Sequence, residues 1–162
     1  DGVYGLLLKD LTFSKIKNNI FRNNTVGIFM DGASKVDLYH NEFVNNGWGL
    51  KINANCMENR LMNNNFENNT FDVSTSGSLV MNSFRNNYWD QYEGYDLDKD
   101  KIGDVPFHPL SLYAVLAEKN SMIMLLYRTF FVEILDRSEK LVPSLTPENF
   151  VDEQPMMKPN KI

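Results

Sequence analysis

The residues best suited to chemistry in this sequence stand in a short acidic segment, at Asp96, Asp98, Asp100, Ile102 and Asp104. Three aspartates at alternate positions, followed by a backbone carbonyl and a further carboxylate, match the first nine positions of a loop that binds a hard cation. Oxygen-only ligation favours calcium over copper or zinc, which prefer nitrogen and sulfur. We therefore expect a structural calcium site here, in which Ile102 contributes its carbonyl oxygen.

The match to such a loop is incomplete. Lys101 stands at the sixth position, where the sharp turn prefers glycine, and Phe107 stands at the twelfth, where a bidentate glutamate is usual. The alternative is a solvated acidic turn without a metal. Residues 90–104 hold six acids against two lysines, and the repulsion among so many carboxylates favours the cation.

A repeat of about 22 residues must position this loop. The motif Asn-x-Phe-x-Asn-Asn recurs four times, with its phenylalanines at Phe21, Phe43, Phe66 and Phe84. The successive spacings are 22, 23 and 18 residues. A fixed period of this size is typical of a solenoid, in which each repeat buries its apolar edge only against its neighbours.

Within each repeat, apolar residues alternate with polar or small ones, as in 26–30 and 36–39. This period of two predicts short strands with one face inward. No repeat holds enough 3.6-period pattern for a full helix, so we expect a right-handed parallel β-helix over residues 1–89. Asparagine suits left-handed corners, and equivalent asparagine and phenylalanine side chains should stack from coil to coil.

The first residues already fit the repeat, because Gly5, Gly27 and Gly49 begin equivalent Gly-aliphatic steps. They lack the basic start and apolar run of a signal peptide. We therefore expect further coils to precede residue 1 in the full protein.

An enzyme on this scaffold would need carboxylates gathered across adjacent coils. The acids of the coil region do not repeat in phase, and we interpret them as scattered surface acids: Asp31, Asp37, Glu42, Glu58, Glu67 and Asp72. His40 is expected at a corner, bonded to a neighbouring asparagine, and Cys56 in the core as a small hydrophobic residue. No catalytic residue is assigned.

Composition excludes some classes of protein. The net charge is −5 and no basic stripe exists, which argues against binding to nucleic acid. Hydrophobic residues make up 43% and charged residues 23%, as in a folded globular protein. Arg128 and Glu133 interrupt the longest apolar stretch, so no transmembrane segment is expected.

The composition changes after residue 109, which divides the chain into coils (1–89), an acidic loop (90–109) and a C-terminal part (110–162). Short and long helices are predicted over 111–120 and 121–141. One apolar stripe of the long helix is Ile123, Leu126, Tyr127, Phe130, Phe131, Ile134 and Leu135. These helices are expected to cap the open end of the solenoid, and the width of the apolar face leaves docking to a partner protein open.

The end of the chain is predicted to be extended and polar apart from Met156 and Met157. Paired methionines can ligate copper(I) through soft thioethers, although they more often serve as packing anchors.

Two segments together carry a resemblance to a known family: residues 86–106, with Asn-Asn-Tyr-Trp-Asp and the acidic loop, and residues 151–159, with Val-Asp-Glu-x-Pro-x-Met-x-Pro. The chain resembles the C-terminal part of the NosD family, whose members are periplasmic maturation proteins of nitrous oxide reductase with carbohydrate-binding and sugar-hydrolase (CASH) repeats. Lys99 and Lys101 depart from the family pattern, in which these positions tend to be glycine.

The resemblance implies a non-catalytic accessory factor in the periplasm. Family members work with an ABC transporter, made of an ATPase and a membrane permease, and support assembly of the copper-sulfur centre of the reductase. The resemblance also implies that the apolar helix face docks onto the permease. For copper, it leaves His108, Met156 and Met157 as the only candidate ligands, and copper is otherwise not assigned to residues. The alternative is a β-helix protein that binds carbohydrate or acts on a polysaccharide.

Overall fold

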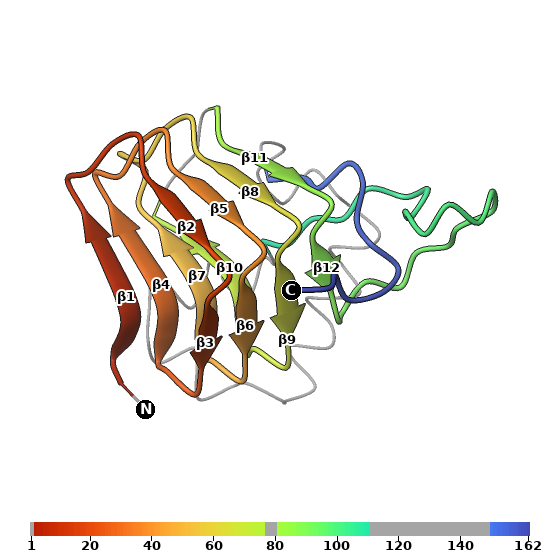
Figure 1. Ribbon diagram of the computed structural model, residues 1–162, viewed down its shortest axis with the longest axis horizontal. Coiled ribbons are helices and arrows are strands. Elements are labelled where there is room, and N and C mark those ends of the chain that lie inside the picture. Colours follow the sequence, from red (N-terminus) through yellow and green to blue (C-terminus); the bar gives the residue numbers. More distant parts are fainter. Residues whose placement is uncertain (1, 77–80, 111–149) are drawn as a thin grey trace.

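The computed structural model describes residues 2–76, 81–110 and 150–162, and over these ranges it consists of strands and loops without helices. The strands form three parallel sheets of four strands each, and every coil of the chain contributes one strand to each sheet (Figure 1). The predicted parallel β-helix is therefore confirmed, with about four coils.

The first sheet holds the longest strands, β1 (Tyr4–Lys9), β4 (Val26–Asp31), β7 (Trp48–Ile52) and β10 (Phe71–Thr75). The second holds β2 (Lys15–Lys17), β5 (Asp37–Tyr39), β8 (Arg60–Met62) and β11 (Ser83–Arg85). The third holds β3 (Ile20–Arg22), β6 (Glu42–Val44), β9 (Asn65–Glu67) and β12 (Tyr88–Trp89).

A stack of aromatic rings runs through the core along the third sheet. Phe21, Phe43 and Phe66 face one another with ring centroids 5.3 and 4.6 Å apart, and Trp89 follows Phe66 at 4.3 Å. Offset stacking at these distances adds to the apolar burial that holds the coils together. The predicted inward phenylalanine stack is confirmed for three of the four motif copies.

The fourth copy was placed wrongly by the sequence interpretation. Phe84 pairs with Leu61 in the second sheet, not with Phe66, whose partner in the next coil is Trp89. The motif thus occurs at two corners of the coil, and 59–64 is an unrecognised copy with leucine in place of phenylalanine. The 18-residue spacing therefore joins Phe66 in the third sheet to Phe84 in the second sheet of the next coil. Equivalent positions of these two coils, such as Phe66 and Trp89, are still 23 residues apart.

Asparagine ladders join the coils. Asn19, Asn41, Asn64 and Asn87 form one ladder, in which each side-chain amide donates to the side-chain oxygen of the next, at 3.1, 3.0 and 3.0 Å. The same oxygen also accepts the backbone N–H of the preceding asparagine. Because Asn41, Asn64 and Asn87 are fully or almost fully buried, these bonds satisfy polar groups that would otherwise be costly to bury.

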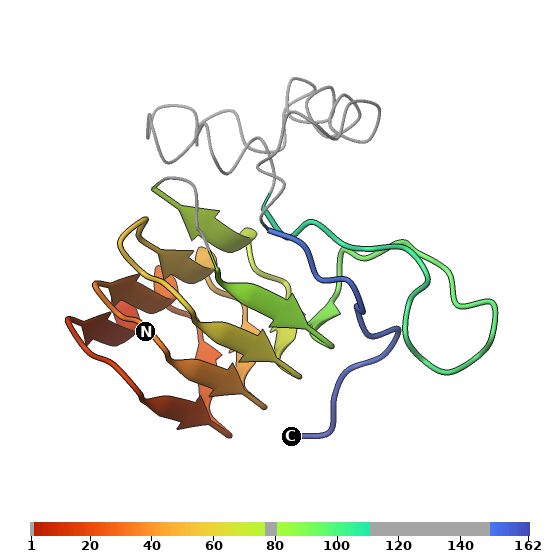
Figure 2. The same cartoon turned by 90° about the horizontal axis from the view of Figure 1, so that it is seen from above.

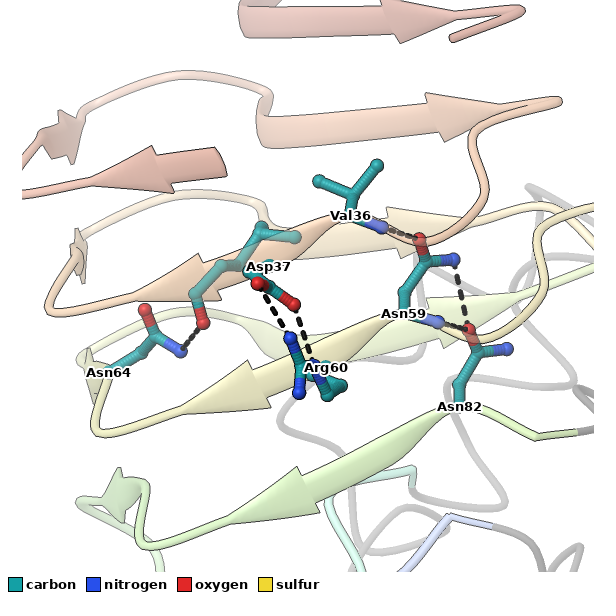
Figure 3. A network of polar contacts seen from close by, with 7 residues as sticks. Val36, Asp37, Asn59, Arg60, Asn64 and Asn82 are labelled. Carbon is teal, nitrogen blue, oxygen red and sulfur yellow. Dashed lines mark hydrogen bonds and ion pairs between the residues drawn. The ribbon is translucent and has the colours of Figure 1, made fainter. Parts of the chain in front are cut away.

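Two further ladders follow the other corners. One joins Asn24, Asn46 and Asn69. The other joins Asn59 and Asn82, whose side chains lie directly above one another in Figure 3. The predicted stacking of corner asparagines is confirmed.

The neighbouring corner positions adopt left-handed backbone conformations, as expected for asparagine. They are Asn18, Asn23, Asn45, Asn63, Asn68 and Asn86, with φ between 54 and 58°. His40, with φ of 52°, is a corner residue as predicted, and its carbonyl oxygen accepts the N–H of Asn18.

The Gly-aliphatic step has a steric cause. A methyl group at Gly27 would lie 2.4 Å from the carbonyl oxygen of Gly49 and 3.0 Å from the ring of Phe43. Only glycine therefore fits between one coil and the aromatic stack.

Among the coil acids, Asp72 departs from the expectation of a surface residue. The register of β10 on β7 aligns Asp72 with Gly49, the last of the equivalent glycines Gly5, Gly27 and Gly49. This position lies inside the protein, and Asp72 is 4% exposed. Its carboxylate accepts a hydrogen bond from Asn69 at 3.1 Å and thereby ends the second asparagine ladder. Burial raises its pKa to about 7.

The two helices predicted over 111–141, and their role as a cap, lie outside the residues that the structure describes. In the part of the chain that it does describe, no helix is long and apolar enough to cross a membrane. Cys56 is fully buried in the core, as predicted, and burial raises the pKa of its thiol.

Candidate metal centre

The acidic segment leaves the last coil after Trp89 and projects from the end of the solenoid as an extended loop (Figure 1). At its far end, Asp96, Asp98 and Asp100 each offer a carboxylate oxygen within 4.8 Å of the others. The alternate spacing read from the sequence therefore places these three side chains together.

The aspartates fold the loop around themselves. The N–H of Asp100 donates to Asp96 at 3.2 Å and to Asp98 at 3.3 Å, and the N–H of Lys101 donates to Asp96 at 2.9 Å. The N–H of Ile102 donates to the carboxylate of Asp100 at 2.7 Å. Turns closed by aspartate side chains are a common local solution, and they hold the carboxylates close without help from the coils.

Both lysines of the loop occupy left-handed conformations, with φ of 64° at Lys99 and 77° at Lys101. The backbone thus adopts the conformation that favours glycine, although the side chains are long. This explains why glycine was expected at the sixth position and shows that lysine does not prevent the turn.

Asp104 lies at the base of the loop and outside the group of three. Its carboxylate accepts the N–H of Leu97 at 2.7 Å, and its own N–H donates to the carbonyl of Tyr95 at 2.8 Å. Ile102 forms an isolated antiparallel bridge with Met156 of the C-terminal tail. The two remaining predicted ligands therefore close the loop and join it to the tail.

The electrostatics of the group favour a cation. The hydrogen bond from Asp100 lowers the pKa of Asp98, but desolvation and the carboxylates of Asp100 and Asp104 together raise it above its ordinary value. Negative charges that disfavour one another are stabilised by a hard cation. The donor set is all oxygen, which suits calcium and does not suit copper(I).

Tyr92 fixes the base of the loop, and sequence reasoning did not single it out. A methyl group at Gly94 would lie 1.9 Å from its hydroxyl, and one at Gly103 would lie 2.0 Å from it, so the phenol is held between two glycines. The hydroxyl donates to the carbonyl of Val105 at 2.6 Å. The sequence signal of this contact is the pair of glycines that follow Tyr92, at positions 94 and 103.

The C-terminal tail covers the end of the last coil, at the opposite end of the solenoid from β1 (Figure 2). Tyr88 and Phe84 form parallel bridges with Met156 and Asp152, and Phe150 lies fully buried with its ring 5.6 Å from that of Phe84. The tail therefore takes the place of a further coil. It is extended, as predicted.

Asp152 is the residue that joins the tail to the coils. Its buried carboxylate accepts the N–H groups of Asn86 and Asn87, the side-chain amide of Asn87 and the indole N–H of Trp89, at 3.0 to 3.2 Å. It also accepts the N–H of Gln154 at 3.1 Å. Five donors compensate the buried charge, and Asp152 ends the first asparagine ladder as Asp72 ends the second.

The candidate copper ligands lie near this junction. The sulfur of Met156 accepts a hydrogen bond from the side chain of Asn86 at 3.9 Å, and Met157 donates its N–H to Lys101. His108 is exposed and follows Phe107, which pairs with Asp152. The predicted partner-binding residues Ile123, Leu126, Tyr127, Phe130, Phe131 and Ile134 lie outside the described residues.

Two comparisons with known proteins, one with family models and one with curated proteins, point to the same family. Residues 1–94 match the model of the family described as periplasmic copper-binding protein (NosD). Two relatives, from Stutzerimonas stutzeri and Pseudomonas aeruginosa, are each named probable ABC transporter binding protein NosD and are 25% identical to 98% of this chain. The chain spans 40% and 41% of the length of these two proteins.

Proposed function

Because the chain belongs to the NosD family of periplasmic copper-binding proteins, we propose that it is part of a non-catalytic accessory factor. In this proposal the protein acts in the periplasm, together with an ABC transporter, in the maturation of the copper-sulfur centre of nitrous oxide reductase. The names of the two relatives support the transporter as a partner.

The use of polar side chains in the solenoid is the observation that carries this proposal. Asp31 accepts hydrogen bonds from Asn53 and Asn55. The carboxylate of Asp37 accepts hydrogen bonds from Nε and Nη2 of Arg60 at 2.7 and 2.8 Å. Asp72 ends an asparagine ladder. Side chains engaged in this way stiffen a frame, which suits a protein that presents surfaces to partners.

We assign the docking surface to the stripe Ile123, Leu126, Tyr127, Phe130, Phe131 and Ile134, from its sequence pattern. The partner in this assignment is the permease of the transporter. An apolar helical face of this width is suited to a groove in another protein.

The test is co-purification of the tagged protein with the permease and ATPase expressed beside it. Phe130→Asp places a charge in the stripe and is expected to abolish recovery of the permease, whereas Thr129→Asp places the same charge on the opposite side and is expected to leave it. An unchanged melting temperature of both variants excludes unfolding as the cause. Equal recovery of the permease with both variants contradicts the assignment.

We assign the acidic loop to calcium, with Asp96, Asp98 and Asp100 as carboxylate ligands, Ile102 through its carbonyl and Asp104 directly or through water. Bound calcium would neutralise the clustered carboxylates and fix the exit from the last coil, which is a structural role. It would leave catalysis and copper transfer to other groups.

Copper itself does not fit the one group of three His, Cys, Asp or Glu ligands found among the described residues, because all three are carboxylates. Cys56 is buried in the core and its thiol has a raised pKa, which disfavours the thiolate that binds metal. His108, Met156 and Met157 stay the candidate copper ligands. Titration of copper(I) into the full-length protein and its Met156→Leu and Met157→Leu variants tests them.

The carbohydrate alternative predicts a different outcome of the same experiments. Binding or turnover of a polysaccharide, together with no recovery of the permease, would favour that alternative over the accessory factor.

A further inference from the structure

A groove of about 540 Å³ runs across the outer face of the second sheet, over strands β2, β5, β8 and β11. Two columns of residues line it, and each contains one residue from each coil. The column on the strands is Lys15, Asp37, Arg60 and Ser83, and the column at the corner before the strands is Phe13, Lys35, Glu58 and Met81.

The corner column is unlike the other corners of the solenoid. All four of its residues have left-handed backbone conformations, with φ of 53, 57, 57 and 66°. Among the described residues of the coils, the other left-handed positions are Asn, His, Asp or Gly, which adopt this conformation at low cost. Phenylalanine and methionine are rare there, and strain of this kind is retained where a side chain has a function.

The side chains of the corner column project into solvent instead of packing. Phe13 is 78% exposed and Met81 is 63% exposed. The ammonium group of Lys35 lies 5.1 Å from the centre of the Phe13 ring and 3.9 Å from the carboxylate of Glu58. The packing of the coils does not explain why Phe13 and Met81 are exposed to solvent at corners with left-handed backbone conformations.

The charge of the groove favours an anionic ligand. Arg60 neutralises Asp37 through two hydrogen bonds, as Figure 3 shows, and Lys35 pairs with Glu58, which leaves Lys15 as an additional exposed cation. On the neighbouring column of the same face, Lys17 and Arg85 add two further positive charges. This face is therefore positive in a chain whose net charge is −5, and complementary charge would guide a negative partner to it.

The apolar ends of the column set the length of the ligand. Phe13 and Met81 are separated by three coil steps, which is about 14 Å at the usual strand spacing. In an extended peptide, residues i and i+4 are about 13 Å apart. A five-residue extended segment therefore reaches from one apolar side chain to the other while its middle residues pass the cations.

We infer that this groove binds an extended acidic segment of a partner protein, with apolar residues at its first and fifth positions. The acidic side chains face Lys15 and the neighbouring Lys17, and the two apolar side chains contact Phe13 and Met81. The inference does not depend on the proposed function, because it involves neither the acidic loop nor the predicted helix.

The test is a peptide array probed with the full chain. Each peptide carries two leucines separated by three positions, which are filled with zero to three aspartates and otherwise serine. The signal is expected to rise with the number of aspartates, to need both leucines, and to fall as salt is added. A signal that does not depend on the aspartates, or binding of polygalacturonate fragments in place of every peptide, overturns the inference.

Variants of the chain localise the binding. Lys15→Gln and Phe13→Asn are each expected to weaken the best peptide about tenfold, and Arg22→Gln, which removes a charge from the third sheet, is the matched control and should not. Phe13→Asn gives this corner the residue used at the others, so its melting temperature should be unchanged or higher. Equal weakening by Arg22→Gln, or a lower melting temperature of Phe13→Asn with unaltered binding, contradicts a site in the groove.

Discussion

The stacked coils and the acidic loop both depend on asparagine and aspartate, and they use these residues in opposite ways. In the coils, buried amides join residues 22 or 23 positions apart, as between Asn41 and Asn64. In the loop, exposed carboxylates accept hydrogen bonds from N–H groups two to seven residues away, as between Asp96 and Lys101. The coils are therefore held by contacts that need the whole stack, whereas the loop folds locally and leaves its oxygens accessible to a cation.

The border between these two regions is held by an aspartate that belongs to neither of them. Asp152 arrives from the tail and accepts the last donors of the first ladder. A ladder of amides always leaves donors at its end, and a carboxylate, which only accepts, satisfies them. Asp72 ends the second ladder through one carboxyl oxygen, which accepts a hydrogen bond from the side chain of Asn69.

We expect the greatest loss of stability from a substitution at this border. Asp152→Ala leaves five donors without an acceptor in a buried site, and we expect the free energy of unfolding to fall by about 3 to 5 kcal/mol. Urea denaturation followed by tryptophan fluorescence measures it, because Trp89 contacts the same carboxylate. The neighbouring exposed residue gives the control, since Glu153→Ala should change stability by less than about 0.5 kcal/mol. Similar losses for both variants would show that Asp152 does not hold the tail.

Within the coils, a ladder residue should be more costly to remove from the middle than from the edge. Asn64→Ala removes the acceptor of two N–H groups of Asn41 and the donor to Leu38 and Asn87. We expect a loss of about 3 kcal/mol, against about 1 kcal/mol for Asn19→Ala at the exposed start of the ladder. Equal losses in a denaturation experiment would contradict a cooperative ladder.

The buried Asp72 predicts a pH dependence with a definite sign. Its pKa is raised from 3.8 to about 7 in the folded protein, so the unfolded chain loses the proton first and the stability contributed by Asp72 falls as the pH rises from about 4 to 7. Asp72→Asn removes this dependence. Relative to wild type, its stability should therefore rise by about 2 to 3 kcal/mol between pH 4.5 and 6.5.

Asp31→Asn is the control for that experiment. Hydrogen bonds from Asn53 and Asn55 lower the pKa of Asp31, so its contribution is lost only as the pH falls below about 4. The difference between Asp31→Asn and wild type should stay constant from pH 4.5 to 6.5. A constant difference for Asp72→Asn as well would show that Asp72 is ionised in the folded protein.

The smallest effect is expected in the loop, where calcium acts on local structure. Free calcium at roughly 30 times its dissociation constant should stabilise the protein by about 2 kcal/mol. Isothermal titration calorimetry, in which calcium is added to the metal-free protein and to its Asp98→Asn variant, measures binding directly. Absence of both heat and a shift in melting temperature would leave the loop a solvated acidic turn.

The sequence is sufficient to predict the coils because their contacts repeat. The spacing of Phe21, Phe43 and Phe66 gave both the period and the stacked aromatic core. The phase of the last coil was misread because Leu61 hides one copy of the motif and Trp89 continues the stack where phenylalanine was expected. A periodic pattern loses its signal where one residue type replaces another of similar size and polarity.

The terminal contacts could be predicted only in part. The alternate aspartates of the loop are local, and their clustering follows from their spacing. Asp152 contacts residues 63 to 66 positions away, and no period links it to the ladder. The burial of Asp72 likewise depends on the register of β10, which its own sequence does not reveal.

The C-terminal tail completes the last coil of the solenoid as a further coil would. Hydrogen exchange of the intact chain, followed by mass spectrometry of peptides covering 83–89 and 150–157, measures whether it does. We predict slow exchange of both peptides, and faster exchange of both in Asp152→Ala while the peptide covering 37–44 stays protected. Exchange of 150–157 within seconds in the wild-type protein, beside protected coils, would contradict the claim.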